Sequence, residues 1–317
     1  MRLALLLLCI CPALTAAQGF PARQISVMVP YPPGSTSDLI PRLVAPHMSQ
    51  SLGVAVIVEN RPGAGGNVGA AAVAKGDASG HQLLMAPSAI LATNQWLYKD
   101  LGYDPQKDLT PVINAATTPN MWVAHPQVEA RTIADVLAAA RARPGALAFA
   151  SGGNGTTGHL CGELLKTTAK VDLLHVPYKG PAPALQDVIA GRVPLMCDNF
   201  SNVIPHVRSG KLKAVALTAF KRHPQASDVP TAHESGLPGF EIGVWYGFAV
   251  PAGAPKAVVE RLNREIASAL GNPKVADRMA DLGLAIVADT PEQFARFVAA
   301  ESDKMRKLVQ ASGARVD

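Results

Sequence analysis

Residues 25–40 read Ile-Ser-Val-Met-Val-Pro-Tyr-Pro-Pro-Gly-Ser-Thr-Ser-Asp-Leu-Ile, a strand followed by a turn and the start of a helix. The alternating apolar residues of 25–29 predict a buried strand, and the prolines and glycine of 30–34 predict a turn. Ser and Asp residues commonly begin helices, so we expect a helix over 38–52. The stretch therefore predicts one strand–turn–helix unit of an α/β protein.

The same order of strand and helix recurs along the chain in two sets, which predicts α/β layers with largely parallel sheets. Further strands are expected at 54–58, 82–86, 112–123, 146–150, 171–176, 193–196, 213–217 and 240–250. Further helices are expected after Gly66 to Ala74 and at 132–143, 158–168, 183–190, 255–270, 273–282 and 291–311. Thr132 with Asp135 and Thr290 with Gln293 predict capping boxes at two of these helices.

The length and composition favour a folded protein of about two domains. The chain has 317 residues, of which 48% are apolar, and domains average roughly 150 residues. This excludes a disordered chain, and the 27 Gly and 26 Pro residues are expected in turns. The net charge of +5 is spread thinly along the sequence, so we expect no nucleic-acid partner.

Residues 1–17 predict a secretory signal peptide. One early Arg precedes an apolar run from Leu3 to Ile10, and the small residues Thr15 and Ala17 predict cleavage between Ala17 and Gln18. The alternative is a membrane anchor, but the run is shorter than the roughly 20 residues that span a bilayer. We therefore expect an exported protein in the periplasm.

Export leaves two cysteines, Cys161 and Cys197, in an oxidising compartment. They are expected either to form a disulfide or to be two buried thiols that pack as small apolar residues. The sequence leaves both outcomes open.

Two glycine-rich loops, 29–38 and 150–159, lie between a predicted strand and a predicted helix. The first N–H groups of a helix have no intrahelical acceptor and carry partial positive charge, so each loop is a candidate anion site. Neither loop contains Lys or Arg. For either loop alone an ordinary N-cap is the preferred explanation, but the occurrence of one in each α/β set favours a ligand held between two domains.

The alternative is an exported nucleotide-binding enzyme, because Gly153-Asn-Gly-Thr-Thr-Gly158 matches G-x-G-x-x-G. The acidic residue that should end the next strand is missing, since Asp172 lies at the start of the expected strand 171–176. The eight His residues are scattered and form no metal-binding motif. We expect no cofactor, no metal and no catalytic activity.

The chain resembles the Bug (TctC-type) family of periplasmic solute receptors, which serve tripartite tricarboxylate transporters. The matching motifs are VPYPPGSTSD (29–38), VENRPGAGG (58–66), SGGNGTTGHL (151–160), Gly162-Glu163, HVPYKG (175–180), GKLKA (210–214), DVPT (228–231), ESGLPGF (234–240), WYG (245–247) and PAG (251–253). The resemblance implies a type II-like Venus flytrap of two α/β domains with two crossings, near 117–120 and 218–221. Residues 18–118 and 221–317 would then form domain 1, and residues 119–220 domain 2.

In this family a ligand carboxylate lies between the two loops, partly bound through ordered water. The resemblance carries that role onto Tyr31, Gly34, Ser35, Thr36 and Asp38 in the first loop and Ser151, Gly152, Asn154, Gly155, Thr156 and Thr157 in the second. Further candidates are Ser88, Tyr178, Asp198 and Asn199, each after a predicted strand, and Trp245, whose alternative role is core packing. Ser35 departs from the family, where a second glycine is usual.

The resemblance implies a receptor that binds a dicarboxylate, a tricarboxylate or an aromatic carboxylate for uptake by the permease subunits of a tripartite transporter. A signalling receptor that presents its ligand to a sensor protein would use the same site, so this alternative stays open. We expect a monomer.

Overall fold

The computed structural model describes residues 19–316, so the expected signal segment 1–17 and its cysteines lie outside the described residues. The strands are β1 (Ile25–Val29), β2 (Val56–Asn60), β3 (Gln82–Pro87), β4 (Leu109–Ala124), β5 (Ala148–Ser151), β6 (Leu174–Pro177), β7 (Leu195–Asn199), β8 (Lys213–Leu217), β9 (Gly243–Pro251) and β10 (Ala285–Ile286). The α-helices are α1 (Thr36–Leu52), α2 (Asn67–Ala74), α3 (Asn94–Leu97), α4 (Ile133–Ala142), α5 (Thr157–Ala169), α6 (Pro181–Ile189), α7 (Phe200–Arg208), α8 (Lys256–Leu270), α9 (Pro273–Asp281) and α10 (Pro291–Ser312). Short helical segments are η1 (Ala64–Gly66), η2 (Ala89–Thr93) and η3 (Pro224–Ala226). None of the helices in 19–316 is long and apolar enough to cross a membrane.

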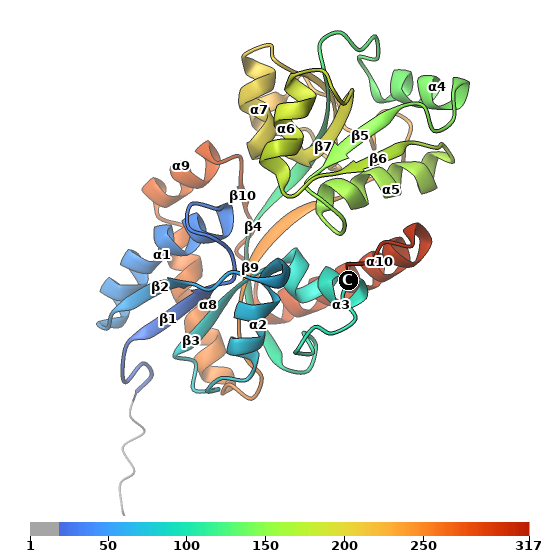
Figure 1. Ribbon diagram of the computed structural model, residues 1–317. Coiled ribbons are helices and arrows are strands. Elements are labelled where there is room, and N and C mark those ends of the chain that lie inside the picture. The colour runs from blue at the N-terminus through green and yellow to red at the C-terminus, as the bar shows by residue number, and fades with distance from the viewer. Residues whose placement is uncertain (1–18, 317) are drawn as a thin grey trace, which may run out of the picture.

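The strands form two α/β lobes that are joined through β4 and β9 (Figure 1). Hydrogen bonds give the strand order β2-β1-β3-β9-β4-β7-β5-β6, and β8 and β10 also pair with β4. Strand β1 is parallel to β2 and β3, and β5 is parallel to β6 and β7. Every antiparallel pair includes β4 or β9. The sheet is therefore mixed: parallel pairing holds within the strand–helix units, and antiparallel pairing occurs where the chain passes between lobes.

Strand β4 carries the chain from lobe 1 to lobe 2. Its residues 109–119 pair with β9, and its residues 120–124 pair with β7. The passage therefore lies between Pro119 and Asn120, inside the expected range 117–120. A continuous strand at this point keeps the two lobes in one hydrogen-bonded sheet.

The return passage lies farther along the chain than expected. We predicted it at 218–221, but Ala226 and Val229 pack in one apolar core of lobe 2, and Phe240 packs in the other. The Ile242 N–H still donates to Thr218 O at 3.1 Å, and the next residue begins β9. We therefore place the passage at 242–243 and assign residues 221–242 to lobe 2.

Helix α10 packs on both lobes. Phe294 and Val298 in its first half pack in lobe 1, and Met305 and Leu308 in its second half join the core that contains Trp122 of lobe 2. In Figure 1 this helix, coloured red, extends from lobe 1 to a position beside α5. The lobes therefore share a packed helix in addition to the two strand passages.

Helix ends follow the expected chemistry, and two helices, the short α3 and α7, were not predicted. Both capping boxes are present, at Thr132 and at Thr290. We did not predict α7, because Pro205 lies inside it and proline disfavours helix interiors. Its residues Phe200, Val203 and Ile204 are buried, and this i, i+3, i+4 face stabilises the helix by packing.

Candidate functional site

A hollow of about 480 Å³ lies between the lobes, and we call it the interlobe cleft. Lobe 1 lines it with the start of α1, the segment after β3 and the start of β9; lobe 2 lines it with the loop before α5, the end of β7 and the starts of α6 and α7. Its residues are Tyr31, Ser35, Thr36, Ser37, Pro87, Ser88, Ala89, Thr93, Val244 and Tyr246 from lobe 1 and Gly152, Gly155, Thr156, Thr157, Pro181, Asp198, Asn199 and Asn202 from lobe 2. The fold therefore brings both glycine-rich loops to one cleft.

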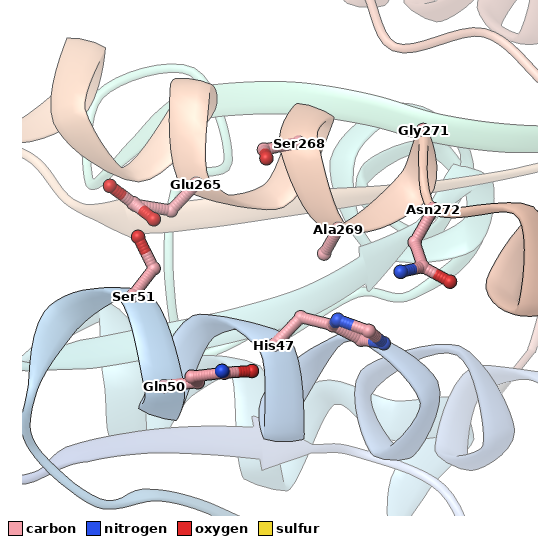
Figure 2. Close-up of a pocket in the computed structure, with 8 residues that line it drawn as sticks. All are labelled: His47, Gln50, Ser51, Glu265, Ser268, Ala269, Gly271 and Asn272. Atoms are coloured by element: carbon pink, nitrogen blue, oxygen red, sulfur yellow. The ribbon is translucent and has the colours of Figure 1, made fainter.

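A separate polar groove lies on lobe 1 between α1 and α8, and it contains none of the predicted site residues (Figure 2). Two of its polar side chains are engaged by neighbouring residues. The Arg261 guanidinium pairs with the Glu265 carboxylate at 2.6 Å, and the Asn272 side chain accepts from Lys274 N–H at the start of α9. The cleft, not this groove, is the candidate ligand site.

The start of α1 presents unused donors to the cleft. Ser35 is its N-cap but makes no capping bond, since its hydroxyl donates to Pro32 O at 2.8 Å. The N–H groups of Asp38 and Leu39 both donate to Ser35 O. Within residues 19–316 this leaves the N–H groups of Thr36 and Ser37 without an acceptor, at the positive end of a 17-residue helix.

Asp38 organises this loop from behind. It is 2% exposed, and its carboxylate accepts from Gly34 N–H at 2.9 Å, from Arg42 Nε at 2.9 Å and from Asn60 Nδ2 at 2.8 Å. Burial opposes ionisation, but the bonds from Arg42 and Gly34 together hold the pKa of Asp38 below its ordinary value. Asp38 and Gly34 are therefore scaffold residues of the turn and do not line the cleft.

The start of α5 also leaves N–H groups free in lobe 2, although its N-cap residue, unlike Ser35, makes a capping bond. Thr156 is its N-cap, and its hydroxyl accepts from His159 N–H at 3.4 Å and donates to Gly153 O at 2.8 Å. The N–H groups of Thr157 and Gly158 have no acceptor within residues 19–316. A second helix therefore points unused donors and its positive end into the cleft.

Two stacked imidazoles support the loop before α5. Gly155 N–H donates to His159 Nδ1 at 3.1 Å, and the rings of His159 and His175 stack with centroids 4.2 Å apart. His175 Nε2 lies 2.7 Å from the Ser151 hydroxyl. Burial lowers the pKa of both imidazoles, that of His175 to about 4. Both are therefore neutral at pH 7 and support the loop without adding charge.

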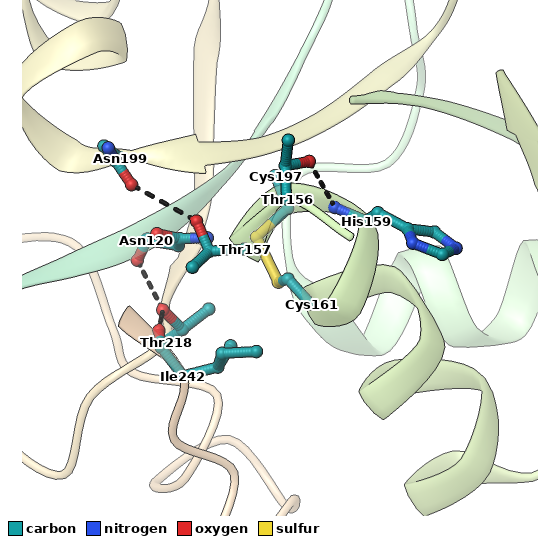
Figure 3. The surroundings of a disulfide bond; sticks show 9 residues. All are labelled: Asn120, Thr156, Thr157, His159, Cys161, Cys197, Asn199, Thr218 and Ile242. Carbon is teal, nitrogen blue, oxygen red and sulfur yellow. Dashed lines mark hydrogen bonds between the residues drawn. A yellow bond between two sulfur atoms is a disulfide. The ribbon is translucent and has the colours of Figure 1, made fainter. Parts of the chain in front are cut away.

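Cys161 and Cys197 form a disulfide, the first of the two outcomes that the sequence left open (Figure 3). The bond joins α5 to β7, and its cysteines are 36 positions apart in the sequence. Beside it, the hydroxyl of Thr157 lies 3.5 Å from Asn199 Oδ1. The start of α5 and the end of β7 are thus held together next to the cleft.

Asp198 and Asn199 are the last residues of β7, whereas we expected them just beyond the strand. Asp198 is 7% exposed, and its carboxylate accepts from Asn202 Nδ2 at 3.1 Å and from the backbone N–H of Asn199. Burial raises the pKa of Asp198 to about 6. Asn202 was missed because α7 was missed; the only sequence signal was its position four residues after Asp198.

No Lys, Arg or His is among the described residues that line the cleft. The positive potential there comes from the N-terminal ends of α1, α5 and α7, and hydroxyl and amide side chains supply further donors. This arrangement suits an anion held by dipoles rather than by an ion pair.

Most residues expected at the site line the cleft, and several do not. Those that line it are Tyr31, Ser35, Thr36, Ser88, Gly152, Gly155, Thr156, Thr157, Asp198 and Asn199. Gly34, Asp38, Ser151, Asn154, Tyr178 and Trp245 are not part of its lining. Ser151 is fully buried behind the loop, Asn154 is exposed, and the Tyr178 hydroxyl donates to Asp187 at 2.7 Å.

Trp245 points away from the cleft, and its neighbour Tyr246 points into it. Alternate residues of a strand face opposite sides, and Trp245 packs at 3% exposure against Phe294 and Phe297. The core-packing alternative therefore holds for Trp245. Side chains alternate between the two faces of a strand, so the sequence could have identified Tyr246 as a cleft residue only if the face directed at the cleft had been known.

Comparisons with known proteins agree with this architecture. Residues 40–314 match the family model described as tripartite tricarboxylate transporter family receptor. Protein BugT of Bordetella pertussis is 36% identical over 304 residues, which cover 95% of this chain and 93% of BugT.

Two solved structures are similar throughout. Rpa4515 of R. palustris with adipate has a TM-score of 0.82 and 36% identity, covering 93% of this chain and 99% of that one. MatC (Rpa3494) from Rhodopseudomonas palustris with bound malate has a TM-score of 0.78 and 34% identity, covering 92% and 100%.

Proposed function

The chain belongs to the tripartite tricarboxylate transporter family of receptors, and we propose that it binds a small carboxylate in the interlobe cleft and delivers it to the membrane permease of such a transporter. We place it in the periplasm, where related binding proteins act. Members of this family are solute receptors, so no catalytic role is proposed.

One observation carries the proposal: helix N-termini from both lobes face the same cleft, and no cationic side chain lines it in residues 19–316. A carboxylate can accept from the free N–H groups at the starts of α1 and α5 and from the hydroxyls beside them. The adipate and malate in the two similar structures are carboxylates of suitable size.

The same geometry suggests how binding closes the receptor. The donors of Thr36 and Ser37 belong to lobe 1, and those of Thr157 and Gly158 belong to lobe 2. A ligand gains both sets of bonds only when the lobes are close together. Binding therefore shifts the equilibrium toward the closed form, the form that a permease would recognise.

The dinucleotide alternative gains no support from the structure. The cleft lies at the carboxyl ends of the parallel strands β5 and β7. Asp172 precedes β6, which is parallel to β5, so it lies at the opposite end of the strands and cannot reach a ribose held by the loop 153–158.

Isothermal titration calorimetry of the purified protein with di-, tri- and aromatic carboxylates tests the proposal. We expect binding of at least one acid, weakened about tenfold or more by Ser37→Ala and by Thr157→Ala, because each removes a cleft-lining hydroxyl that can donate to a charged group. Ser268→Ala, a hydroxyl in the groove between α1 and α8, is the matched control and should leave the affinity unchanged. Absence of binding by every acid would refute the proposed ligand class.

Delivery to a permease has its own test. Cells that lack the permease but keep this receptor should lose uptake of the bound acid. Undiminished uptake, together with a transcriptional response to the acid that needs the receptor, would instead support presentation of the ligand to a sensor protein.

A further inference from the structure

Asp198 is an unexpected group in a cleft built for anions. Among the described residues that line the cleft it is the sole acid, and no base lines the cleft to balance it. Its side chain is almost fully enclosed, with 7% of the residue exposed. A carboxylate ligand therefore enters a space that already holds a buried carboxyl group.

The partners of Asp198 are neutral. Asn202 Nδ2 and the Asn199 N–H donate to its carboxylate. Helix α6 lines the cleft with Pro181, which carries no titratable group. The titratable group that faces it from lobe 1 is Tyr246, whose pKa is raised by burial. Since no cation offsets the cost of burying its charge, the pKa of Asp198 rises to about 6.

Asp198 lies across the cleft from the donors of α1. Thr36 and Tyr246 of lobe 1 line the same cleft as Asp198 of lobe 2. When one carboxylate of a small ligand binds at the start of α1, the rest of the ligand lies in the part of the cleft that Asp198 lines.

We infer that Asp198 contacts the second functional group of the ligand. As a carboxylate it accepts a hydrogen bond from a ligand hydroxyl or ammonium group. When a second ligand carboxylate lies against it, Asp198 takes up one proton from solvent, and its O–H donates to that carboxylate. Two carboxylates in contact cannot both stay ionised without a cation between them. The inference rests on the proposed carboxylate-binding function. It adds that dicarboxylates bind with uptake of a proton, whereas acids that carry a hydroxyl or ammonium group bind without it.

Proton uptake makes the affinity for dicarboxylates depend on pH. If binding takes up one proton, the binding constant rises up to tenfold for each pH unit by which the pH is lowered. This holds over the pH range in which Asp198 is ionised in the free protein and protonated in the complex. We expect this between pH 8 and pH 6.5, where the ligand carboxyls stay ionised. Hydroxy and amino monocarboxylates should show no such dependence.

Calorimetry of the wild-type protein at pH 7 in two buffers with different ionisation enthalpies measures the proton uptake directly. The probes are succinate, glutarate and adipate as dicarboxylates, and 3-hydroxybutyrate and 4-aminobutyrate as matched acids with a donor. We expect uptake of up to one proton with a dicarboxylate that binds and none with the donor acids. Dicarboxylate binding without proton uptake would overturn the inference.

The variant Asp198→Asn should abolish proton uptake and the pH dependence, and it should weaken binding of the donor acids at least tenfold. Asp277→Asn removes the same charge from an exposed position on α9 and should change neither. Equal behaviour of the two variants would overturn the inference while leaving the carboxylate receptor intact. If none of these acids and none of the tricarboxylates or aromatic carboxylates binds, the proposed function fails and this inference fails with it.

Discussion

The stacked imidazoles of His159 and His175 link a local pKa to the stability of the ligand site. Neither ring contacts the cleft, yet His159 holds the Gly155 N–H and His175 contacts the Ser151 hydroxyl behind the same loop. Glu163 and Lys166 are the charged groups near them. Because burial lowers the pKa of both rings, the loop keeps its arrangement only while they are neutral.

We therefore expect stability to fall as the pH is lowered from about 6.5 to about 4. The folded-state pKa of His175 lies near 4, below the unfolded value of about 6.5, so the unfolded chain binds more protons in this window. Asp198 has the opposite effect on stability. Its folded-state pKa is raised to about 6, so its protonation stabilises the folded protein as the pH falls from about 6 toward its ordinary pKa. Urea unfolding at pH 7.5 and pH 5 should show a smaller loss in His175→Gln than in the wild type. An equal loss in both proteins would show that His175 does not contribute.

Two neighbouring elements, α5 and β7, supply Thr157, Asp198 and Asn199 to the lobe 2 side of the cleft. The disulfide joins them directly beneath Thr157 and Asn199, which both line the cleft. Gly158 lets them approach closely, since a Cβ there would lie 2.3 Å from Cys197 O. The covalent link and the close packing together fix the donors of α5 relative to Asp198.

Removing the disulfide should lower the free energy of unfolding by about 4 kcal/mol, because the bond closes a long loop in the unfolded chain. The double variant Cys161→Ala, Cys197→Ala, measured by urea unfolding, tests this expectation. Wild-type protein unfolded under dithiothreitol is the control and should lose a similar amount. A loss below about 1 kcal/mol in both would contradict the expected contribution of the bond.

Lobe 1 also contacts the second glycine-rich loop at the rim of the cleft. Val316 N–H donates to Leu97 O at 3.0 Å, which holds the C-terminal segment beside α3. A Cβ at Gly155 would lie 2.6 Å from Leu97 Cδ1 and 3.2 Å from Val316 Cγ2. The close approach of the lobes at this point therefore depends on the absence of a side chain at Gly155.

Gly155→Ala should hinder closure and weaken ligand binding about tenfold. Gly155 has φ of +80°, so the variant also strains the backbone. Gly210→Ala is the matched control, because Gly210 has φ of +72° but no atom within 4 Å of its Cβ position. Calorimetry and small-angle scattering with a bound acid should show weaker binding and a larger radius of gyration in Gly155→Ala alone. Equal effects in both variants would assign the loss to strain.

Residues close together in sequence were sufficient to predict most of the strand–helix units, both capping boxes and the two loops with free amides. These features follow from hydrogen bonds and burial patterns that span a few residues, as at Ser35 to Asp38 and Thr132 to Asp135. The resemblance to solute receptors extended this to most of the cleft lining.

The tertiary fold was needed for everything that depends on contacts between distant segments. The sequence did not show that Tyr246 rather than Trp245 faces the cleft, that α7 brings Asn202 to Asp198, or that the chain returns to lobe 1 at 242–243. The raised pKa of Asp198 is of the same kind, because desolvation depends on which elements surround a carboxyl group. Local patterns therefore determine the donors that this receptor offers, and long-range packing determines which of them meet in one cleft and which acid lies among them.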